Sequence, residues 1–353
     1  MLRAIDEENN CPTENQVCIS IDATALYPSL NREETAKVCA ELVVESGLWF
    51  RAIDWEELGL YLVLTGRVEN LDPDCLPSRK YTGGQKPMIT TAEVLGPITR
   101  DREKSKFLPP LRSPNEVEQR AMLHNMVNEG IRTVMTNHTY SWNGEIRLQS
   151  KGGGIGDKLA GEAARLYLVS FDRRFVSTIN ESNLQMTLYK RYVDDGNIKG
   201  QIVPRGYTWN ATSNSLILTL NPEADTRPPG QRTAEAFQAV ANSITSMLKW
   251  TADFPEAHDD QKLPVLDLAL WCMETSTGTI TLYEFYMKPT SSLVSIPANS
   301  ALPVSTKFSA YRQEVFRILR NTSVSLPWAI KAKHLSDLSW RMHVSGYQEN
   351  FRG

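Results

Sequence analysis

Two adjacent acidic residues stand mid-chain between strand-like segments, in the stretch Arg191-Tyr192-Val193-Asp194-Asp195-Gly196. The residue pattern of segments 184–193 and 197–203 is typical of two strands, and Gly196 between them is typical of a turn. We therefore expect the acids at the tip of a hairpin. Neighbouring carboxylates repel each other, and a divalent cation offsets that repulsion. For such a motif in isolation a solvated acidic turn is the better interpretation. The rest of the sequence favours a metal-bearing hairpin instead.

A third acid follows a short apolar segment near the start of the chain. Residues 17–22 predict a strand that ends at Asp22, and residues 23–29 predict the turn after it. Alone, Asp22 is more typical of a turn or a helix cap. Together with Asp194 and Asp195 it predicts a site for two magnesium ions, with manganese as an alternative. In such a site one ion activates an attacking oxygen and the other stabilises a leaving pyrophosphate.

A glycine-rich stretch, Gln149 to Ala160, precedes a segment with the periodicity of a long helix. Glycines at this position let the backbone approach a base, a sugar or a phosphate closely. The stretch lacks the Gly-Lys-Ser/Thr ending of a P-loop and the strand of a dinucleotide fingerprint. A nucleotide-contacting loop of another kind and a merely flexible joint both remain open.

Hydrophobic periodicity and turn residues predict the remaining elements. Segment 67–114, rich in Pro, Gly, Lys and Arg, predicts an inserted loop. A hairpin is expected at 140–149 with its turn at Asn143-Gly144, and a strand pair at 263–271 and 279–285. Helices are expected at 31–47 (with Asn31 as cap), 54–64, 116–135, 158–179, 231–250, 307–320 and 327–345.

Composition excludes several classes of protein. No uninterrupted apolar run is long enough to cross a bilayer, which excludes a membrane-spanning protein. The acidic N-terminal residues and the five scattered cysteines indicate an intracellular protein that is not secreted. The five histidines show no ligand pairing, so a structural zinc site is not expected. A net charge of -3 argues against a protein that simply coats nucleic acid, although basic patches occur at 151–158 and 307–341.

The sequence resembles the reverse transcriptases, most specifically those of Penelope-like retroelements, over nearly the whole chain except 67–114. Six stretches in the family's order carry the resemblance: Ser20-Ile21-Asp22-Ala23-Thr24-Ala25-Leu26-Tyr27-Pro28, Gln149-x-x-Gly152-x-x-x-Gly156-x-x-x-Ala160 (with Ala160 in place of the usual serine), Tyr192-Val193-Asp194-Asp195, Leu263-Pro264-Val265-Leu266-Asp267-Leu268, Tyr286-Met287-Lys288-Pro289-Thr290 and Ser345-Gly346-Tyr347.

The resemblance implies an α+β fold, the right-hand polymerase, whose palm is an antiparallel sheet backed by helices. It implies a first palm strand and catalytic turn at 1–30, partial fingers and palm helices at 31–148, the palm with its catalytic hairpin at 149–290, and a helical thumb at 291–353. The implied activity is RNA-directed DNA synthesis from an RNA template, a DNA primer and deoxynucleoside triphosphates. No membrane partner is implied, and the sequence does not indicate a protein partner.

In that family frame, the catalytic and metal-binding residues are Asp22, Asp194 and Asp195. The nucleotide-binding residues are Tyr27, Ala23, Gln149 and Gly152, and those for primer or template are Lys151, Tyr192 and Lys288. The aromatic ring of Tyr27 would lie against the sugar and leave no room for a 2′-hydroxyl, which selects deoxynucleotides. Either Lys249 or Lys262 would protonate the pyrophosphate, and Asp267 is expected to be structural.

One departure from the family concerns the fingers. Reverse transcriptases carry a basic segment before the first catalytic Asp, whereas only about twenty largely acidic or neutral residues precede Asp22 here. The sequence therefore leaves two alternatives beside the polymerase. One is a catalytically impaired derivative that binds nucleic acid, which we rank second. The other is an RNA-dependent RNA polymerase, which we rank third.

Overall fold

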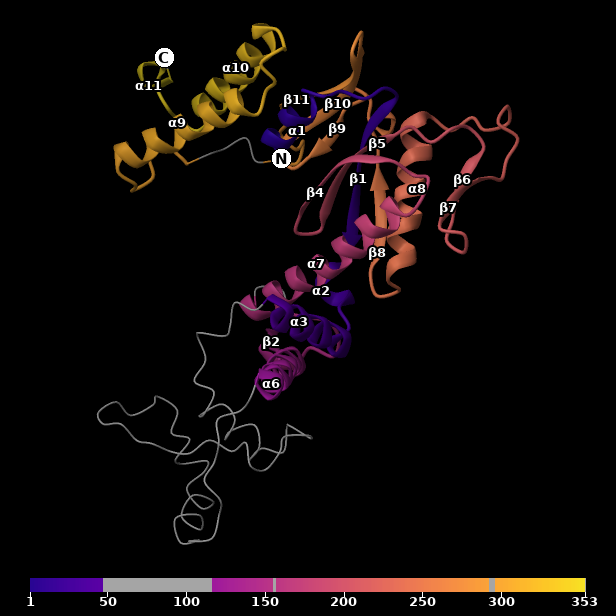
Figure 1. The fold of residues 1–353 in the computed structure, drawn as a ribbon. Helices are drawn as coiled ribbons and strands as arrows, with labels where there is room; N and C mark the ends of the chain where they lie inside the picture. The colour runs from indigo at the N-terminus through magenta and orange to yellow at the C-terminus, as the bar shows by residue number, and fades with distance from the viewer. Residues whose placement is uncertain (47–115, 155–156, 292–295, 353) are drawn as a thin grey trace, which may run out of the picture. The chain divides into compact units, whose positions relative to one another are not determined.

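The structure, a computed structural model, describes residues 1–46, 116–154, 157–291 and 296–352 (Figure 1). The helix expected at 54–64 and the insertion expected at 67–114 lie outside these residues. The described chain contains helices and antiparallel sheets, in agreement with the expected α+β class. It divides into two compact units, a first unit of Met1–Thr24 with Arg174–Gly353 and a second unit of Ala25–Arg173.

The first unit contains a four-stranded antiparallel sheet in the order β4-β5-β1-β8. Its strands are β1 (Gln16–Thr24), β4 (Met186–Tyr192), β5 (Asp195–Gln201) and β8 (Lys249–Asp253). Because β1 has a partner on each side, most of its residues are buried. The first strand and the hairpin expected from the sequence are confirmed, although the second hairpin strand begins at Asp195 and so includes Gly196.

Aromatic side chains cover one face of this sheet. Phe237 of α8 (Pro229–Ile244) lies so close to Gly200 that a Cβ there would be 2.7 Å from the ring. The ring centroid of Phe175, from the end of α7 (Lys158–Asn180), lies 5.2 Å from that of Tyr189 and 6.4 Å from that of Phe237. The sheet is therefore a buried and rigid support for residues at the ends of its strands.

The helix expected at 231–250 ends earlier, at Ile244, so the sequence-based boundary was wrong. Trp250 lies instead in β8, where it is paired with Ala23 of β1 and fully buried. Side-chain amides of Gln238 and Asn242 bind its backbone. Pairing with β1 gives the backbone of this segment hydrogen-bond partners and buries the Trp250 side chain. This stabilisation outweighs the helical periodicity that continues through the segment.

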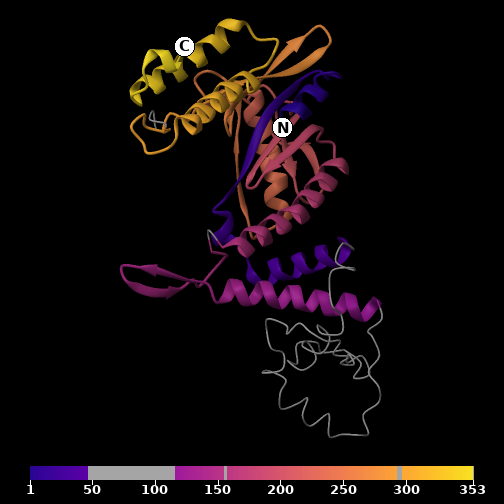
Figure 2. The same cartoon turned by 90° about the vertical axis from the view of Figure 1, so that its left-hand side faces the viewer.

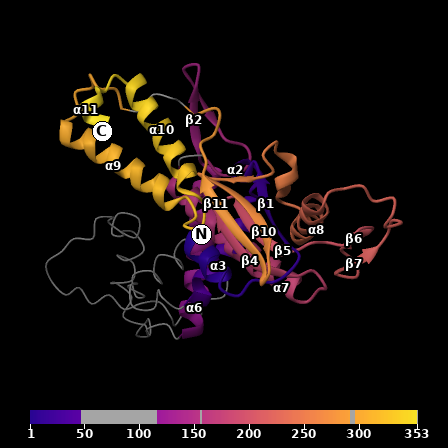
Figure 3. The ribbon, with the colours of Figure 1, turned by 90° about the horizontal axis from the view of Figure 1, so that it is seen from above.

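A second sheet has the order β11-β10-β9, formed by β9 (Leu263–Val265), β10 (Leu268–Thr275) and β11 (Gly278–Phe285) (Figure 1). Figure 3 shows β10 and β11 side by side. The sequence predicted one strand over 263–271, and this was wrong because the chain reverses at Leu266-Asp267. Leu266 has a φ of +56°. Asp267 fixes the reversal, since its backbone oxygen accepts from Tyr286 N at 2.8 Å and its carboxylate from the Asn321 amide at 2.7 Å. This confirms the structural role expected for Asp267.

Two long helices follow, α9 (Val304–Arg320) and α10 (Trp328–Val344), and a short one, α11 (Glu349–Arg352). They confirm the helices expected at 307–320 and 327–345. Figure 2 shows α9 and α10 lying side by side, and they share an apolar cluster with the end of β11. The cluster consists of Phe285, Ile318, Leu338, Met342 and Tyr347. Smaller elements of the first unit are α1 (Leu2–Glu8), the hairpin β6 (Tyr207–Asn210) and β7 (Ser215–Leu218), and η3 (Pro255–Ala257).

The second unit contains α2 (Leu26–Ser29), α3 (Arg32–Ser46), α6 (Glu116–Thr136), the hairpin β2 (Thr139–Trp142) and β3 (Glu145–Leu148), and α7 as far as Arg173. The expected cap is confirmed, since Asn31 Oδ1 accepts from Glu34 N at 3.1 Å. The expected turn is confirmed as well, with Asn143 and Gly144 both at positive φ. In the described part of the chain no helix is long and apolar enough to span a membrane.

Candidate functional site

The β4–β5 hairpin carries the two adjacent acids. Tyr192 pairs with Asp195, so Val193 and Asp194 form the tip of the turn. Val193 has a φ of +55°, a conformation that costs a β-branched residue of the order of 1–3 kcal/mol. The Arg191 guanidinium donates to Val193 O and holds the tip in this form. Gly196 is not a turn residue: it lies in β5, where a Cβ would meet the Ile21 side chain at 2.9 Å.

Strand register brings Asp22 to this hairpin. Asp22 of β1 pairs directly with Asp195 of β5. Residues that face each other on antiparallel strands point to the same side of the sheet, so these two carboxylates share one face. The N–H of Ala23 donates to Asp194 O at 3.4 Å, which joins the tip of the hairpin to β1. The three aspartates predicted from the sequence therefore gather at one end of the β1–β5 pair.

Electrostatics show that the three aspartates affect one another. Burial raises the pKa of Asp22, and the charge of Asp194 raises it further. Burial likewise raises the pKa of Asp195, with additional increases from Asp194 and Asp22, while the ammonium of Lys288 lowers it. Repulsion among like charges means that a cation bound here would stabilise the ionised carboxylates.

The donor set fits a hard divalent cation, because it consists of carboxylate oxygens alone. Within the described residues, no group of three or more His, Cys, Asp or Glu side chains is arranged so that it could hold a metal ion. Magnesium needs fewer protein ligands than that, since it keeps several waters and takes further oxygens from substrate phosphates. Paired carboxylates such as those of Asp22 and Asp195 would therefore supply part of the coordination of such an ion, and waters or other oxygen ligands would supply the rest.

Three other predicted residues lie near these acids in the first unit. The side chain of Ala23 is only 2% exposed, so only its backbone N–H lies beside the hairpin. Tyr192 is 61% exposed, and its pairing places it on the same face of the sheet as Asp195. Lys288 is exposed and close enough to lower the pKa of Asp195.

The predicted nucleotide-binding residues Tyr27, Gln149 and Gly152 lie together in the second unit. Gly153 N donates to Tyr27 O at 2.9 Å. Gly152 has a φ of +69°, and a Cβ there would lie 2.3 Å from Tyr27 O. The Gln149 amide donates to the backbone oxygens of Lys151 and Gly153, both at 2.9 Å, so this side chain holds the loop in shape. The side chain of Lys151 is exposed.

Sequence reasoning missed Arg32, which fixes this glycine-rich loop from the start of α3. Its guanidinium donates to Gln149 O at 2.7 Å and to Gly152 O at 3.1 Å. An arginine in the first turn of a helix resembles an ordinary solvent-exposed residue, so the sequence held no signal for this role. Sequence reasoning also missed Asn197, a buried residue of β5 that follows Asp195 by two positions and is 5% exposed.

The two candidate lysines differ in their surroundings. Lys262 Nζ lies 2.6 Å from Glu284 Oε1 and 4.7 Å from the centre of the Trp271 ring. Lys249 is exposed at the start of β8, where it pairs with Thr24 of β1. Since Thr24 is two residues from Asp22, Lys249 is the candidate in the sheet that carries the aspartates, on the strand next to β1.

Comparison with known proteins gives no family for this chain. No protein-family model matches the sequence, and no curated protein matches it significantly.

Proposed function

We propose that the chain is an RNA-directed DNA polymerase of the Penelope-like reverse transcriptase type. The observation that carries this proposal is the register of β1 and β5, which sets Asp22 opposite Asp195 and beside Asp194. These acids come from distant parts of the sequence, and their proximity is unfavourable in the ionised form, because burial and then the neighbouring carboxylates raise the pKa of Asp22 and of Asp195. Binding of divalent cations would offset this cost.

In the proposed reaction Asp22, Asp194 and Asp195 would hold two magnesium ions. When bound, these ions supply Lewis-acid activation of the primer 3′-hydroxyl and charge stabilisation for the departing pyrophosphate. The other residues of the site hold the three carboxylates in position. The buried sheet fixes Asp22 and Asp195, and the bond from Arg191 to Val193 O fixes the hairpin tip. Lys288 contributes a cation for a primer phosphate.

Selectivity for deoxynucleotides is assigned to Tyr27, as the family resemblance implies. Contacts within the second unit support a nucleotide-binding role for its surroundings. The backbone oxygen of Tyr27 accepts a hydrogen bond from the glycine-rich loop. At Gly152 of that loop there is no room for a side chain, because the Tyr27 backbone lies against it. These contacts hold residues 149–153 in place without a ligand, which lowers the entropy lost on binding.

A primer-extension assay tests the proposal. The chain is mixed with an RNA template, a DNA primer, deoxynucleoside triphosphates and magnesium, and product length is measured. We expect extension that stops on addition of EDTA and that Asp194→Ala abolishes. Asp259→Asn is the matched control, because Asp259 is exposed and lies outside the site. Extension that persists in Asp194→Ala would overturn the assignment.

The same assay separates the two alternatives. Salt-sensitive binding of RNA without incorporation, unchanged in Asp194→Ala, would indicate a nucleic-acid-binding derivative. Incorporation of ribonucleotides in preference to deoxynucleotides would indicate an RNA-dependent RNA polymerase.

A further inference from the structure

Two free thiols lie next to each other between the two sheets of the first unit. The Sγ atoms of Cys18 in β1 and Cys272 in β10 are 3.3 Å apart, although the two residues are 254 positions apart in the sequence. Both cysteines are free. Since a disulfide bond holds its sulfurs about 2 Å apart, an approach of little more than about 1 Å would join this pair.

Packing between the sheets holds the two thiols together. Cys18 is 3% exposed and belongs to an apolar cluster with Leu263 and Leu270 of the second sheet, and Cys272 packs against that cluster. Thr281, which pairs with Cys272 across β10 and β11, has its hydroxyl oxygen 3.6 Å from Cys18 Sγ. The Cys18 side chain is therefore directed at β10 and β11, and it cannot turn away without opening a close-packed cluster.

We propose that Cys18 and Cys272 form an oxidation site, at which a peroxide produces an intramolecular disulfide bond. Cys272 is the more exposed of the two thiols and reacts with the peroxide first. Its sulfur attacks one peroxide oxygen and the O–O bond breaks, so that a sulfenic acid and one water form. The Cys18 sulfur then attacks the Cys272 sulfur, the S–O bond breaks, and the hydroxyl leaves with the Cys18 proton as a second water. The two thiols are oxidised together, and one peroxide molecule is reduced to two waters.

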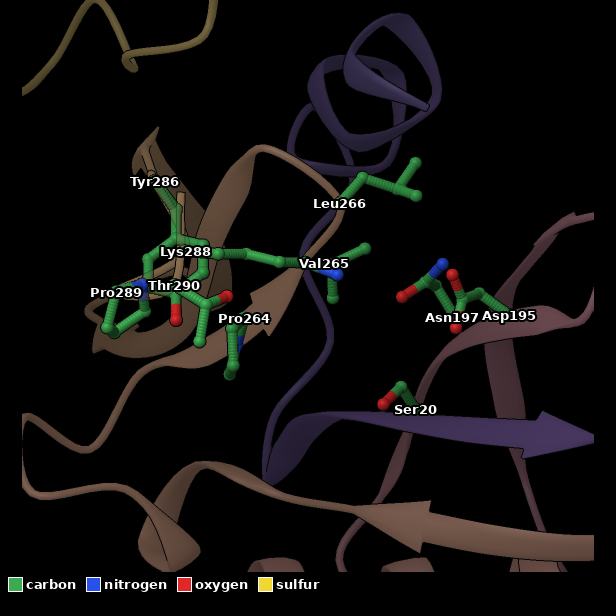
Figure 4. A pocket seen from close by; sticks show the side chains of 10 residues that line it. All are labelled: Ser20, Asp195, Asn197, Pro264, Val265, Leu266, Tyr286, Lys288, Pro289 and Thr290. Carbon is green, nitrogen blue, oxygen red and sulfur yellow. The ribbon is translucent and has the colours of Figure 1, made fainter. Parts of the chain in front are cut away.

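The disulfide would act on the strand that carries Asp22. Alternate residues of a strand lie on one face, so Cys18, Ser20 and Asp22 share one side of β1. Figure 4 shows Ser20 lining the same cavity as Val265 of the second sheet. Oxidation would therefore link the second sheet covalently to this face of β1. The inference goes beyond the proposed polymerase activity, because the reaction needs neither metal ions nor nucleic acid.

Peptide mapping of the full chain tests the inference, after treatment with hydrogen peroxide and alkylation of the remaining free thiols. We expect a disulfide between Cys18 and Cys272 in most folded molecules, and dithiothreitol should reverse it. In concentrated urea the two residues are far apart along an unfolded chain, so the yield of this disulfide should fall at least about tenfold. A folded chain in which the two thiols stay free, or are oxidised without being joined, would overturn the proposal.

Three variants control the experiment. Cys11→Ala removes an exposed thiol of the same unit and should leave the disulfide unchanged. Asp194→Ala should also form it normally, so that failure of the proposed polymerase and failure of this site remain distinguishable. Cys272→Ala removes a partly exposed thiol, should fold, and should abolish the disulfide.

Thermal denaturation gives a second measurement of the same disulfide. It closes a long loop and so restricts the unfolded chain. Peroxide should therefore raise the melting temperature of the wild-type chain by about 5 °C or more, and it should not raise that of Cys272→Ala. Equal shifts in the two chains would show that the peroxide acts elsewhere and would rule out the proposed site.

Discussion

At the residue scale, the central feature is the pair of strands that holds Asp22 against Asp195 despite their repulsion. In the folded chain burial and Asp194 raise the pKa of Asp22. The ionised form of Asp22 is therefore less favourable in the folded state than in the unfolded state. This penalty applies at neutral pH and disappears as the pH falls below the ordinary range of a carboxyl group, where both states are protonated.

We therefore predict that Asp22→Asn makes the chain more stable and less active. In EDTA at neutral pH its free energy of unfolding should exceed that of the wild type, and the difference should shrink toward acid pH. Primer extension should fall about a hundredfold or more, the size of effect seen when one charge-stabilising group is removed. Urea denaturation at several pH values provides the measurement. Asp259→Asn serves as control, and a variant less stable than wild type at neutral pH would refute the argument.

The sequence contained enough information to place the acids but not the residues that support them. The strand-like segments on both sides of Asp194 and Asp195 predicted a hairpin, and the apolar segment before Asp22 predicted a strand that ends at this acid. The register of β1 and β5 agrees with both predictions. Asn197 carried no such signal, because a polar residue in a strand normally faces solvent. In the folded chain Asn197 is instead 5% exposed, and it lines a cavity together with residues after β11 that are distant in sequence.

At the element scale, an ion pair buried beneath the sheet links α1 to β5. Lys199 is fully buried, and its ammonium binds both oxygens of Glu8 at 2.8 and 2.6 Å and Thr279 O at 2.9 Å. Loss of one partner from such a pair leaves an uncompensated charge in the interior. The pair therefore fixes α1 and β11 to the strand that begins at Asp195.

We predict that Glu8→Ala lowers the free energy of unfolding by about 3–5 kcal/mol, the range for breaking a buried ion pair. Glu7→Ala is the matched control, because Glu7 pairs with the exposed Arg3, and such surface pairs contribute little. Urea denaturation monitored by circular dichroism gives both values. Equal and small losses in the two variants would show that Glu8 is not needed to compensate the buried charge of Lys199.

The glycine-rich loop supports a second prediction at this scale. Gly152→Ala places a side chain at a positive φ and within 2.3 Å of Tyr27 O, so we expect a loss of stability above about 1–2 kcal/mol. Gly130→Ala is the contrasting variant, because Gly130 lies in α6 with nothing within 4 Å of its Cβ position. That variant should gain about 0.5–1 kcal/mol. If both changes proved neutral in thermal denaturation, the loop would not be fixed against Tyr27.

Local signals predicted most elements, and tertiary pairing explains the failures. The turn at Asn143-Gly144 and the cap at Asn31 each depend on a few neighbouring residues, and both are confirmed. The reversal at Leu266 could not be predicted from its neighbours, because leucine does not favour positive φ. It is stabilised by Asn321, which is remote in the sequence. Trp250 likewise enters β8 only because β1 provides a partner.

At the scale of the whole molecule, the family resemblance assigns roles to residues of both compact units. The three aspartates belong to the first unit, whereas Tyr27 and the glycine-rich loop belong to the second. The link in the sequence is short, because β1 carries Asp22 and ends at Thr24, just before α2 with Tyr27. A substitution at Tyr27 should therefore change the choice of substrate without disturbing the acids.

We predict that Tyr27→Ala relaxes the preference for deoxynucleotides over ribonucleotides by at least about tenfold, because the small side chain leaves room for a 2′-hydroxyl. Tyr27→Phe keeps the ring and should retain the preference of the wild type. Incorporation of single deoxynucleotides and ribonucleotides on an RNA template, compared as ratios of kcat/KM, measures the effect. A loss of activity in Tyr27→Ala with an unchanged ratio would assign the ring a structural role. A wild-type preference for ribonucleotides would instead favour RNA synthesis, since the bulk of Tyr27 would then not be what selects the sugar.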